Sequence, residues 1–292
     1  MVRNSTRARA FIAGVPPGNV YSKWRGAHWV LADLADLGYP PGASELIPKR
    51  DRVADQWLSP HYYTEFEAKS KAKAYGREGV PIMEGRYRRC GSQQGNALRS
   101  MVRLGVADER ADQLAERLLH WQWPDGGWNC DRNPTADTSS FMETLTPMRG
   151  LAAYAKWRRD DTAAAAARAA AEVFLTRGLF RRRRDGNPIH PSFRKLHYPL
   201  YWHYDILGGL VAMADLNLLS DQRCEEALDL LESKRLADGG WPAEAKFYST
   251  SEGAVSGTTA LDWGGTSGKR MNPWVTVQAL SVLVAAGRLK PQ

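Results

Sequence analysis

The sequence predicts an all-α fold in which helical hairpins repeat around an axis, as an (α/α) toroid. The tetrapeptide Asp-Gly-Gly-Trp occurs at residues 125–128 and again at 238–241. Each copy follows two segments whose apolar residues recur at helical spacing, so the repeating unit is a helical pair closed by a Gly-Gly-Trp turn. No segment shows convincing strand or βαβ alternation, and we therefore expect no sheet.

The expected helices come in pairs along the chain, and in each pair one is rich in small apolar residues and the other in charge. This difference predicts an inner and an outer ring of helices. Asp108 is expected to cap its helix, and Asn272-Pro273 to begin the last one. The ranges are 28–38, 46–58, 92–104, 108–121, 141–157, 162–176, 201–216, 221–234 and 272–287.

Two regions follow from this pattern. Residues 1–89 are expected to be an N-terminal helical extension with a long loop or lid at 59–88, packed on the toroid. Residues 90–292 are expected to be the toroid itself, with both Gly-Gly-Trp turns.

Composition narrows the class of protein. No apolar run approaches the ~20 residues of a membrane helix, and the apolar stretch near the N-terminus is too short for a signal peptide. We therefore expect a soluble, cytoplasmic protein without stable membrane insertion. Three cysteines among 292 residues are too few for a disulfide scaffold.

The net charge of +8 suits an anionic substrate, an anionic membrane or nucleic acid. The one dense basic run, Arg181–Arg184, is interpreted as a solvated loop, with an anion contact as the alternative. Nucleic acid is not expected as a partner, because no zinc-finger, RNP or helix-turn-helix pattern accompanies the run.

Two segments carry a family resemblance. Residues 121–128 read Trp-Gln-Trp-Pro-Asp-Gly-Gly-Trp and resemble the Gln-Trp motif of squalene and oxidosqualene cyclases. Residues 201–212 are similar to an inner helix of the protein prenyltransferase β subunit. The resemblance covers roughly residues 90 to 290. It implies the toroid of that superfamily and a terpenoid cyclase-like or prenyltransferase-like activity.

The chain also departs from that superfamily. It lacks the Asp-x-Asp-Asp motif with which class II cyclases protonate an alkene. Asp160-Asp161 lacks the third carboxylate of the class I magnesium motif, and a triterpene cyclase needs two such domains. The sequence therefore predicts a short, divergent member and not a conventional squalene cyclase.

Catalytic candidates lie where inner helices begin, since the helix N-termini of a toroid ring one mouth of its cavity. Glu143 and Asp205 are the expected acid/base pair, because burial would raise the pKa of a carboxyl there. Capping of the helix N-terminus is the alternative for both. Asp131 and His203 complete the catalytic set, with a hydrogen-bonded packing role as the alternative for His203.

Substrate contacts are expected from polar and aromatic side chains at the same helix starts. Aromatic rings there could stabilise a carbocation through their faces. The alternative is that they only pack between the repeated helices. The set comprises His28, Trp29, Cys90, Gln93, Gln94, Asn96, Trp202, Tyr204 and Trp274.

Zinc is the cofactor that the resemblance suggests, because protein prenyltransferases hold it with Asp, Cys and His. Cys130, Asp131 and His203 offer these ligand types, with Cys90 as a fourth. The Asp-x-Cys spacing of that family is absent, and small buried thiols are the alternative. No other cofactor is expected.

The expected function is enzymatic: acid/base chemistry on a bulky, largely apolar small molecule, isoprenoid-like or terpenoid-like, with or without an anionic group. A carbohydrate-active lyase or hydrolase is an alternative on the same fold, because carboxylate pairs and Trp platforms also suit sugars. A toroid that binds a ligand or a partner without catalysis is the third reading.

Overall fold

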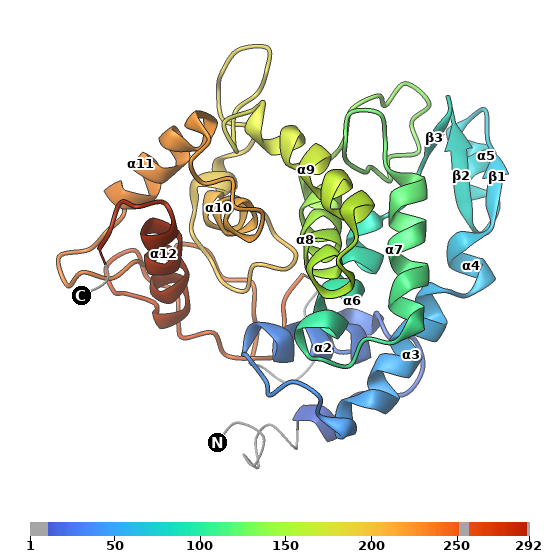
Figure 1. The fold of residues 1–292 in the computed structure, drawn as a ribbon, viewed down its shortest axis with the longest axis horizontal. Helices are drawn as coiled ribbons and strands as arrows, with labels where there is room; N and C mark the ends of the chain where they lie inside the picture. Colours follow the sequence, from blue (N-terminus) through green and yellow to red (C-terminus); the bar gives the residue numbers. More distant parts are fainter. Residues whose placement is uncertain (1–10, 251–256, 291–292) are drawn as a thin grey trace. The chain divides into compact units, whose positions relative to one another are not determined.

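The computed structural model describes residues 11–250 and 257–290. The chain forms two compact units, Met1–Ala170 and Ala171–Gln292 (Figure 1). The boundary expected at residues 89 and 90 falls inside the first unit, because helices on both sides of it pack together there. The fold is mostly helical, as predicted, and the toroid stays a prediction.

Helices form most of the first unit. They are η2 (Ser22–Trp24), α2 (Ala27–Asp36), η3 (Ser44–Leu46), α3 (Ile47–Trp57), α6 (Gly91–Arg103), α7 (Glu109–Trp121) and α8 (Phe141–Arg158). Helix α9 (Asp161–Leu175) crosses the boundary. Helix α6 packs on α2, α7 and α8, and its buried Met101 joins a core with Leu34, Val53 and Leu114. Burial of these apolar side chains is the main stabilising term.

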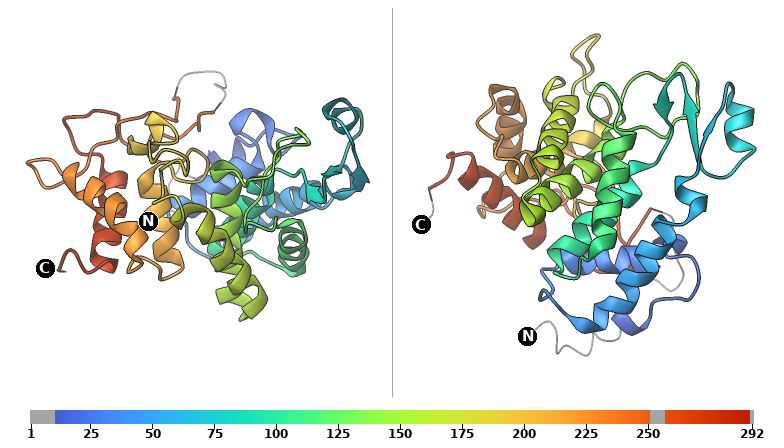
Figure 2. Two further views of the ribbon diagram at one scale, coloured as in Figure 1. Left: turned by 90° about the horizontal axis from the view of Figure 1, so that it is seen from above. Right: turned by 45° about the vertical axis from the view of Figure 1, so that its right-hand side comes forward.

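Two glycines bring α6 and α8 into backbone contact. A Cβ atom on Gly95 would lie 2.3 Å from the backbone nitrogen of Pro147. A Cβ atom on Gly150 would lie 2.5 Å from the carbonyl oxygen of Gly95. The two helices therefore cross more closely than any larger side chains would allow, and Figure 2 shows them side by side.

A small sheet lies between α3 and α6, so the expectation of no strands was wrong there. The elements are α4 (Pro60–Tyr63), β1 (Glu65–Glu67), α5 (Lys71–Tyr75), β2 (Val80–Met83) and β3 (Arg86–Tyr87). Strand β2 pairs in parallel with β1 and antiparallel with β3. The strands are too short to show a periodic pattern. The turn Glu84-Gly85, with φ of 50° and 67°, is the signal that the sequence did offer.

The second unit contains η4 (Pro191–Arg194), α10 (Ile206–Asp215), η5 (Gln222–Cys224), α11 (Glu225–Ser233) and α12 (Pro273–Ala285). Helix α10 packs on α11 and α12. It begins at Ile206 and not at the predicted Tyr201, because Asp205 caps it by accepting from Gly208 N. Trp202, His203 and Tyr204 therefore precede the helix that was expected to contain them.

The two Gly-Gly-Trp turns make the same hydrogen bonds. The indole of Trp128 donates to the Leu118 carbonyl at 3.0 Å, and that of Trp241 to the Leu231 carbonyl at 2.7 Å. The backbone N–H of each tryptophan donates to a threonine hydroxyl in the following helix, Thr144 Oγ1 at 3.2 Å and Thr276 Oγ1 at 2.8 Å. Each tryptophan thus ties its turn to the helix before it and the helix after it.

Within residues 11–250 and 257–290, no helix has the length and apolar character needed to cross a membrane. The cytoplasmic location stays a prediction.

Candidate metal centre and adjoining pocket

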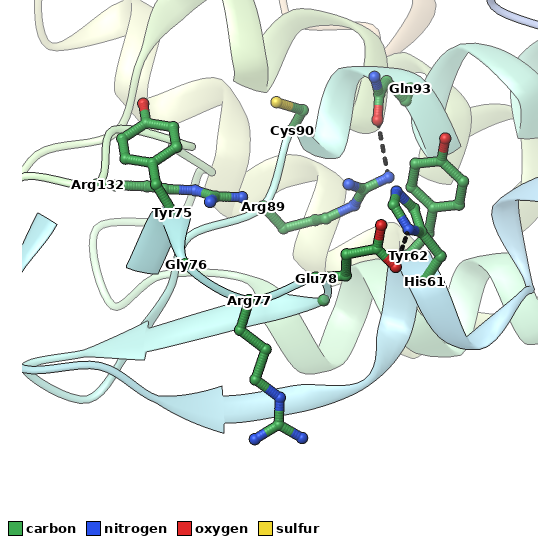
Figure 3. Close-up of a pocket in the computed structure, with 11 residues that line it drawn as sticks. His61, Tyr62, Tyr75, Gly76, Arg77, Glu78, Arg89, Cys90, Gln93 and Arg132 are labelled. Atoms are coloured by element: carbon green, nitrogen blue, oxygen red, sulfur yellow. Dashed lines mark hydrogen bonds and ion pairs between the residues drawn. The ribbon is translucent and has the colours of Figure 1, made fainter. Parts of the chain in front are cut away.

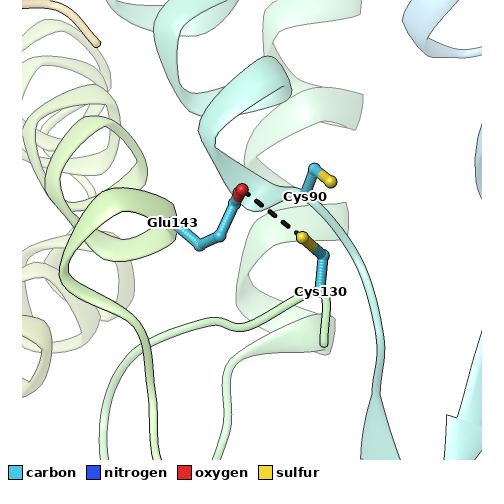
Figure 4. Close-up of side chains that lie close together, drawn as sticks. All are labelled: Cys90, Cys130 and Glu143. Carbon is cyan, nitrogen blue, oxygen red and sulfur yellow. Dashed lines mark hydrogen bonds between the residues drawn. The ribbon is translucent and has the colours of Figure 1, made fainter. Parts of the chain in front are cut away.

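Three potential metal ligands meet in the first unit. Cys90 directly precedes α6, Cys130 lies in the loop after the first Gly-Gly-Trp turn, and Glu143 is in the first turn of α8. One ligand atom from each lies within 4.8 Å of the others (Figure 4). The close α6–α8 crossing is what brings the starts of these two helices together.

Local contacts hold the two cysteine-bearing segments in place. Arg88, buried beside Cys90, donates to the carbonyls of Ala136 at 2.8 Å and Pro134 at 3.3 Å in the loop that carries Cys130. Asp125 of the turn accepts from the hydroxyl of Ser139 at 2.6 Å. The loop is therefore anchored in its middle, at Pro134 and Ala136, and near its end, at Ser139.

Burial favours the neutral forms of Glu143 and Cys130. Glu143 is only 8% exposed, and burial raises the pKa of its carboxyl, although Ser92 N donates to Oε2 at 3.2 Å. The thiol of Cys130 donates to Glu143 Oε1 at 3.5 Å. A hydrogen bond with Cys90, burial and the Glu143 charge all raise the pKa of Cys130. Anionic forms of all three groups would repel one another, and a bound cation would relieve that repulsion.

A buried guanidinium lies next to the three ligands. Arg89 donates to Gln93 Oε1 at 2.7 Å and lies 5.0 Å from the centroid of the Tyr62 ring. Burial lowers the pKa of Arg89, and the charges of Cys90 and Glu143 oppose that shift. The fully buried Gln94 amide also faces Arg89. In the amide orientation that satisfies both of its ends, Gln94 Oε1 accepts from Arg89 Nη2 at 2.7 Å and Gln94 Nε2 donates to the Cys90 carbonyl at 3.2 Å.

A pocket of about 370 Å³ opens beside this group (Figure 3). Most of its wall is polar or charged. The lining residues are His61, Tyr62, Tyr75, Gly76, Arg77, Glu78, Gly79, Arg89, Cys90, Gln93 and Arg132. Cys90 belongs both to the wall and to the group of three ligands, so the pocket and the candidate metal centre are continuous.

The ligand group differs from the predicted zinc set. Cys130 is shared, but Asp131 is exposed and its carboxylate accepts from Asn133 N at 2.9 Å, which closes a local turn. His203 belongs to the second unit. In the structure, Cys130 lies close to Cys90 and Glu143. Cys90 was predicted as a fourth zinc ligand, and Glu143 as an acid or base.

His28, Trp29 and Asn96 are buried in the first unit and are not among the residues that line this pocket. His28 Nδ1 accepts from the Trp57 indole at 3.2 Å, and its Nε2 lies 3.3 Å from the Asn96 amide. Burial lowers the pKa of His28 to about 3. These contacts describe a neutral histidine held in the core.

The remaining candidates lie in the second unit. Asp205 is completely buried, and its two oxygens accept from Gly208 N at 2.7 Å and His197 N at 2.8 Å. The imidazole of His197 also lies 2.8 Å from Asp205 Oδ2. The bond from Gly208 N caps α10, which was the alternative role for Asp205, and the bond from His197 N ties the preceding loop to the same carboxylate.

The aromatic candidates of this unit have packing partners. The His203 ring stacks on Phe247 with centroids 3.5 Å apart, and burial lowers its pKa to about 4. The Tyr204 hydroxyl donates to the Leu179 carbonyl at 2.6 Å. Trp274 stacks on Tyr198, while Trp202 is half-buried. Their roles in substrate binding stay predictions.

Arg89, Tyr62 and Tyr21 are site residues that sequence reasoning missed. Tyr21 is close enough to Glu143 and Cys90 for their charges to add to burial in raising its pKa. The only signal for Arg89 was its place directly before Cys90, in the pair Arg88-Arg89. No signal marked the two tyrosines, which reach the site from segments remote in sequence.

No model of a known protein family matches the sequence, and no curated protein matches it at a significant level.

Proposed function

We propose that the protein is a zinc-dependent enzyme whose metal centre consists of Cys90, Cys130 and Glu143. The approach of their ligand atoms to within 4.8 Å of one another carries this proposal. In a tetrahedral zinc site, a sulfur and an oxygen ligand lie about 3.5 Å apart, given the usual bond lengths. Cys130 Sγ and Glu143 Oε1 are 3.5 Å apart. Three protein ligands leave a fourth position open, as in catalytic zinc sites.

The charge around the group supports a divalent cation. Two thiolates and one carboxylate carry one negative charge more than zinc neutralises. Arg89 is buried beside them and interacts with the charges of all three. A loaded centre would therefore be close to neutral, which reduces the cost of burying it.

The neighbouring pocket supports hydrolysis or group transfer as the reaction class. When bound, zinc would lower the pKa of a coordinated water or polarise a substrate oxygen. Because Cys90 is part of the pocket wall, a substrate in the pocket would lie beside the open position. Gln93 and Tyr62 line the same wall and would orient it through hydrogen bonds.

The isoprenoid-like substrate and the cyclase-like or prenyltransferase-like activity stay predictions that rest on the resemblance. The polar wall of this pocket does not favour a largely apolar ligand, so our proposal leaves that part of the expectation out. The carbohydrate-active and non-catalytic alternatives require no zinc at these three residues, which makes metal content the discriminating observation.

Elemental mass spectrometry tests the proposal on protein purified without a chelator or a nickel column. We expect one zinc per chain in the wild type, and its loss in Cys90→Ser and Cys130→Ser. Cys224→Ser is the matched control, because Cys224 is buried in the second unit and should not affect the metal. Absence of zinc after supplementation, or unchanged zinc in the first two variants, would contradict the proposal.

Activity is the second part of the test. Zinc-loaded protein should hydrolyse a chromogenic carboxylic or phosphoric ester, and removal of the metal should abolish turnover. A zinc-loaded protein that turns over neither ester would exclude the hydrolase and restrict the proposal to group transfer.

A further inference from the structure

We infer that the pocket beside Cys90 is an oxyanion-binding subsite that holds a carboxylate or phosphate group of the substrate, with Arg132 as its principal ligand. The placement of this anion next to a metal rests on the proposed function. The subsite itself rests on separate residues, namely the arginines and the wall that the segment between α3 and α6 contributes.

Arg132 brings a positive charge into the pocket that no carboxylate neutralises among the described residues. Its Nη1 donates to the Ala74 carbonyl at 2.5 Å, and its guanidinium lies 4.5 Å from the centroid of the Tyr75 ring. Both partners are uncharged, and they hold the planar group without using all of its donors. In Figure 3 the side chain of Arg132 extends toward Arg89.

Arg89 supplies a second guanidinium with neutral partners. It donates to the Gln93 amide and, in the Gln94 orientation described above, to the Gln94 amide, and it forms no ion pair with a carboxylate among the described residues. In a metal-loaded protein, Arg89 would balance the excess charge of the centre. The charge of Arg132 would then remain for a ligand.

The acidic residue of the pocket wall is largely exposed. Glu78 Oε2 lies 2.8 Å from His61 Nδ1, and the Glu78 side chain is 77% exposed, so water and salt screen its charge. The third arginine, Arg77, points away from the other labelled side chains in Figure 3 and lies over the Phe66 ring, 5.0 Å from its centroid. The inward face of the pocket is therefore positive.

The ligand class follows from the geometry of guanidinium groups. A guanidinium presents parallel N–H donors that match the two oxygens of a carboxylate or phosphate. A pocket of about 370 Å³ has room for a small molecule that carries such a group. Residues 61, 62 and 75–79 contribute to its wall, so the segment between α3 and α6 would determine which anions fit.

Isothermal titration with inorganic phosphate and, separately, with acetate tests this inference at constant ionic strength. The full-length protein is titrated both zinc-loaded and metal-free, because zinc can itself bind phosphate. We expect one phosphate per chain in both forms. Arg132→Gln should weaken binding at least about tenfold, as expected for a lost charge-assisted hydrogen bond. Arg132→Lys should recover part of that loss, because lysine restores the positive charge but lacks the paired N–H donors of a guanidinium.

Arg168→Gln is the matched control and should change the affinity by less than about twofold, since Arg168 is exposed on α9 and is not among the residues that line the pocket. Binding of acetate but not phosphate would support the inference and identify the group as a carboxylate. No binding of either anion to the metal-free protein, or equal losses in Arg168→Gln and Arg132→Gln, would overturn it. Zinc content measured on the same samples separates the two claims: zinc without anion binding contradicts the subsite alone, and anion binding without zinc contradicts the metal centre alone.

Discussion

The thiol of Cys130 lies 3.5 Å from the carboxylate oxygen Oε1 of Glu143, a sulfur–oxygen separation that matches two corners of a tetrahedral zinc site. The two groups come from a loop and from a helix, and Cys90 joins them from the start of another helix. The metal centre therefore depends both on the three ligands and on the contacts that bring them together.

Zinc should protect two of the three cysteines from alkylation together. Cys90 and Cys130 are half-buried and should react with N-ethylmaleimide in metal-free protein, whereas the buried Cys224 should not. Cys130 should be the slower of the two, because its hydrogen bond with Cys90, burial and the Glu143 charge raise the pKa of its thiol. Zinc should slow both reactive sites in parallel, because both sulfurs would be coordinated. Mass spectrometry of peptides measures each site. Protection of one cysteine without the other would argue against a shared metal.

Gly95→Ala should destabilise the first unit and weaken zinc binding. The new Cβ would lie 2.3 Å from Pro147 N, so α6 and α8 would have to separate. Overpacking of this kind costs about 1–3 kcal/mol. Gly268→Ala is the control, because no atom lies within 4 Å of its added Cβ. Urea unfolding and zinc competition give the two readouts. Equal behaviour of the two variants would show that the close crossing does not position the ligands.

The matched tryptophans should contribute similarly to stability but differently to the metal centre. Trp128→Phe and Trp241→Phe each remove an indole bond to a helix carbonyl, at a cost of about 1 kcal/mol. A Cβ added to Gly91 would lie 3.0 Å from the Trp128 side chain, so Trp128 also supports the start of α6. Only Trp128→Phe should therefore weaken zinc binding. Weaker zinc binding in Trp241→Phe as well would count against this assignment.

Stability should fall as the pH drops below about 6.5, in part through His28. Burial lowers the pKa of His28 to about 3 in the folded protein, whereas an unfolded histidine has a pKa of about 6.5. The unfolded chain therefore binds more protons between these values, and acid favours unfolding.

From pH 7 to pH 5 this one group should cost about 2 kcal/mol of unfolding free energy. Urea titrations of the wild type and His28→Gln at both pH values check this. The variant should lose less stability than the wild type over that interval. An equal loss would mean that His28 is not held neutral.

The helices were predictable because their causes are local. Apolar spacing and caps such as Asp108 and Asn272 act within a few residues, and α7 and α12 begin directly after them. The start of α10 was missed because Asp205, and not the apolar pattern before it, sets that boundary. The strands were missed because segments of two to four residues carry no measurable period.

The site was predictable in its parts but not in its grouping. Cys130 was a candidate zinc ligand, Cys90 a substrate contact or a fourth zinc ligand, and Glu143 an acid or base. Their meeting depends on the contact between Gly95 and Gly150, which are far apart in sequence. No pattern within a single helix reports such a contact. Arg89 was missed for the same reason, since its burial results from packing against Tyr62 and Gln93.

X-ray absorption at the zinc K-edge tests the central claim most directly, because it counts the sulfur atoms around the metal. On zinc-loaded protein we expect two sulfur ligands at about 2.3 Å together with oxygen or nitrogen ligands at about 2.0 Å. Cys130→Ser should reduce the sulfur count to one, and Glu143→Gln should leave it at two. A first shell without sulfur, or with four sulfurs, would contradict a centre built from Cys90, Cys130 and Glu143.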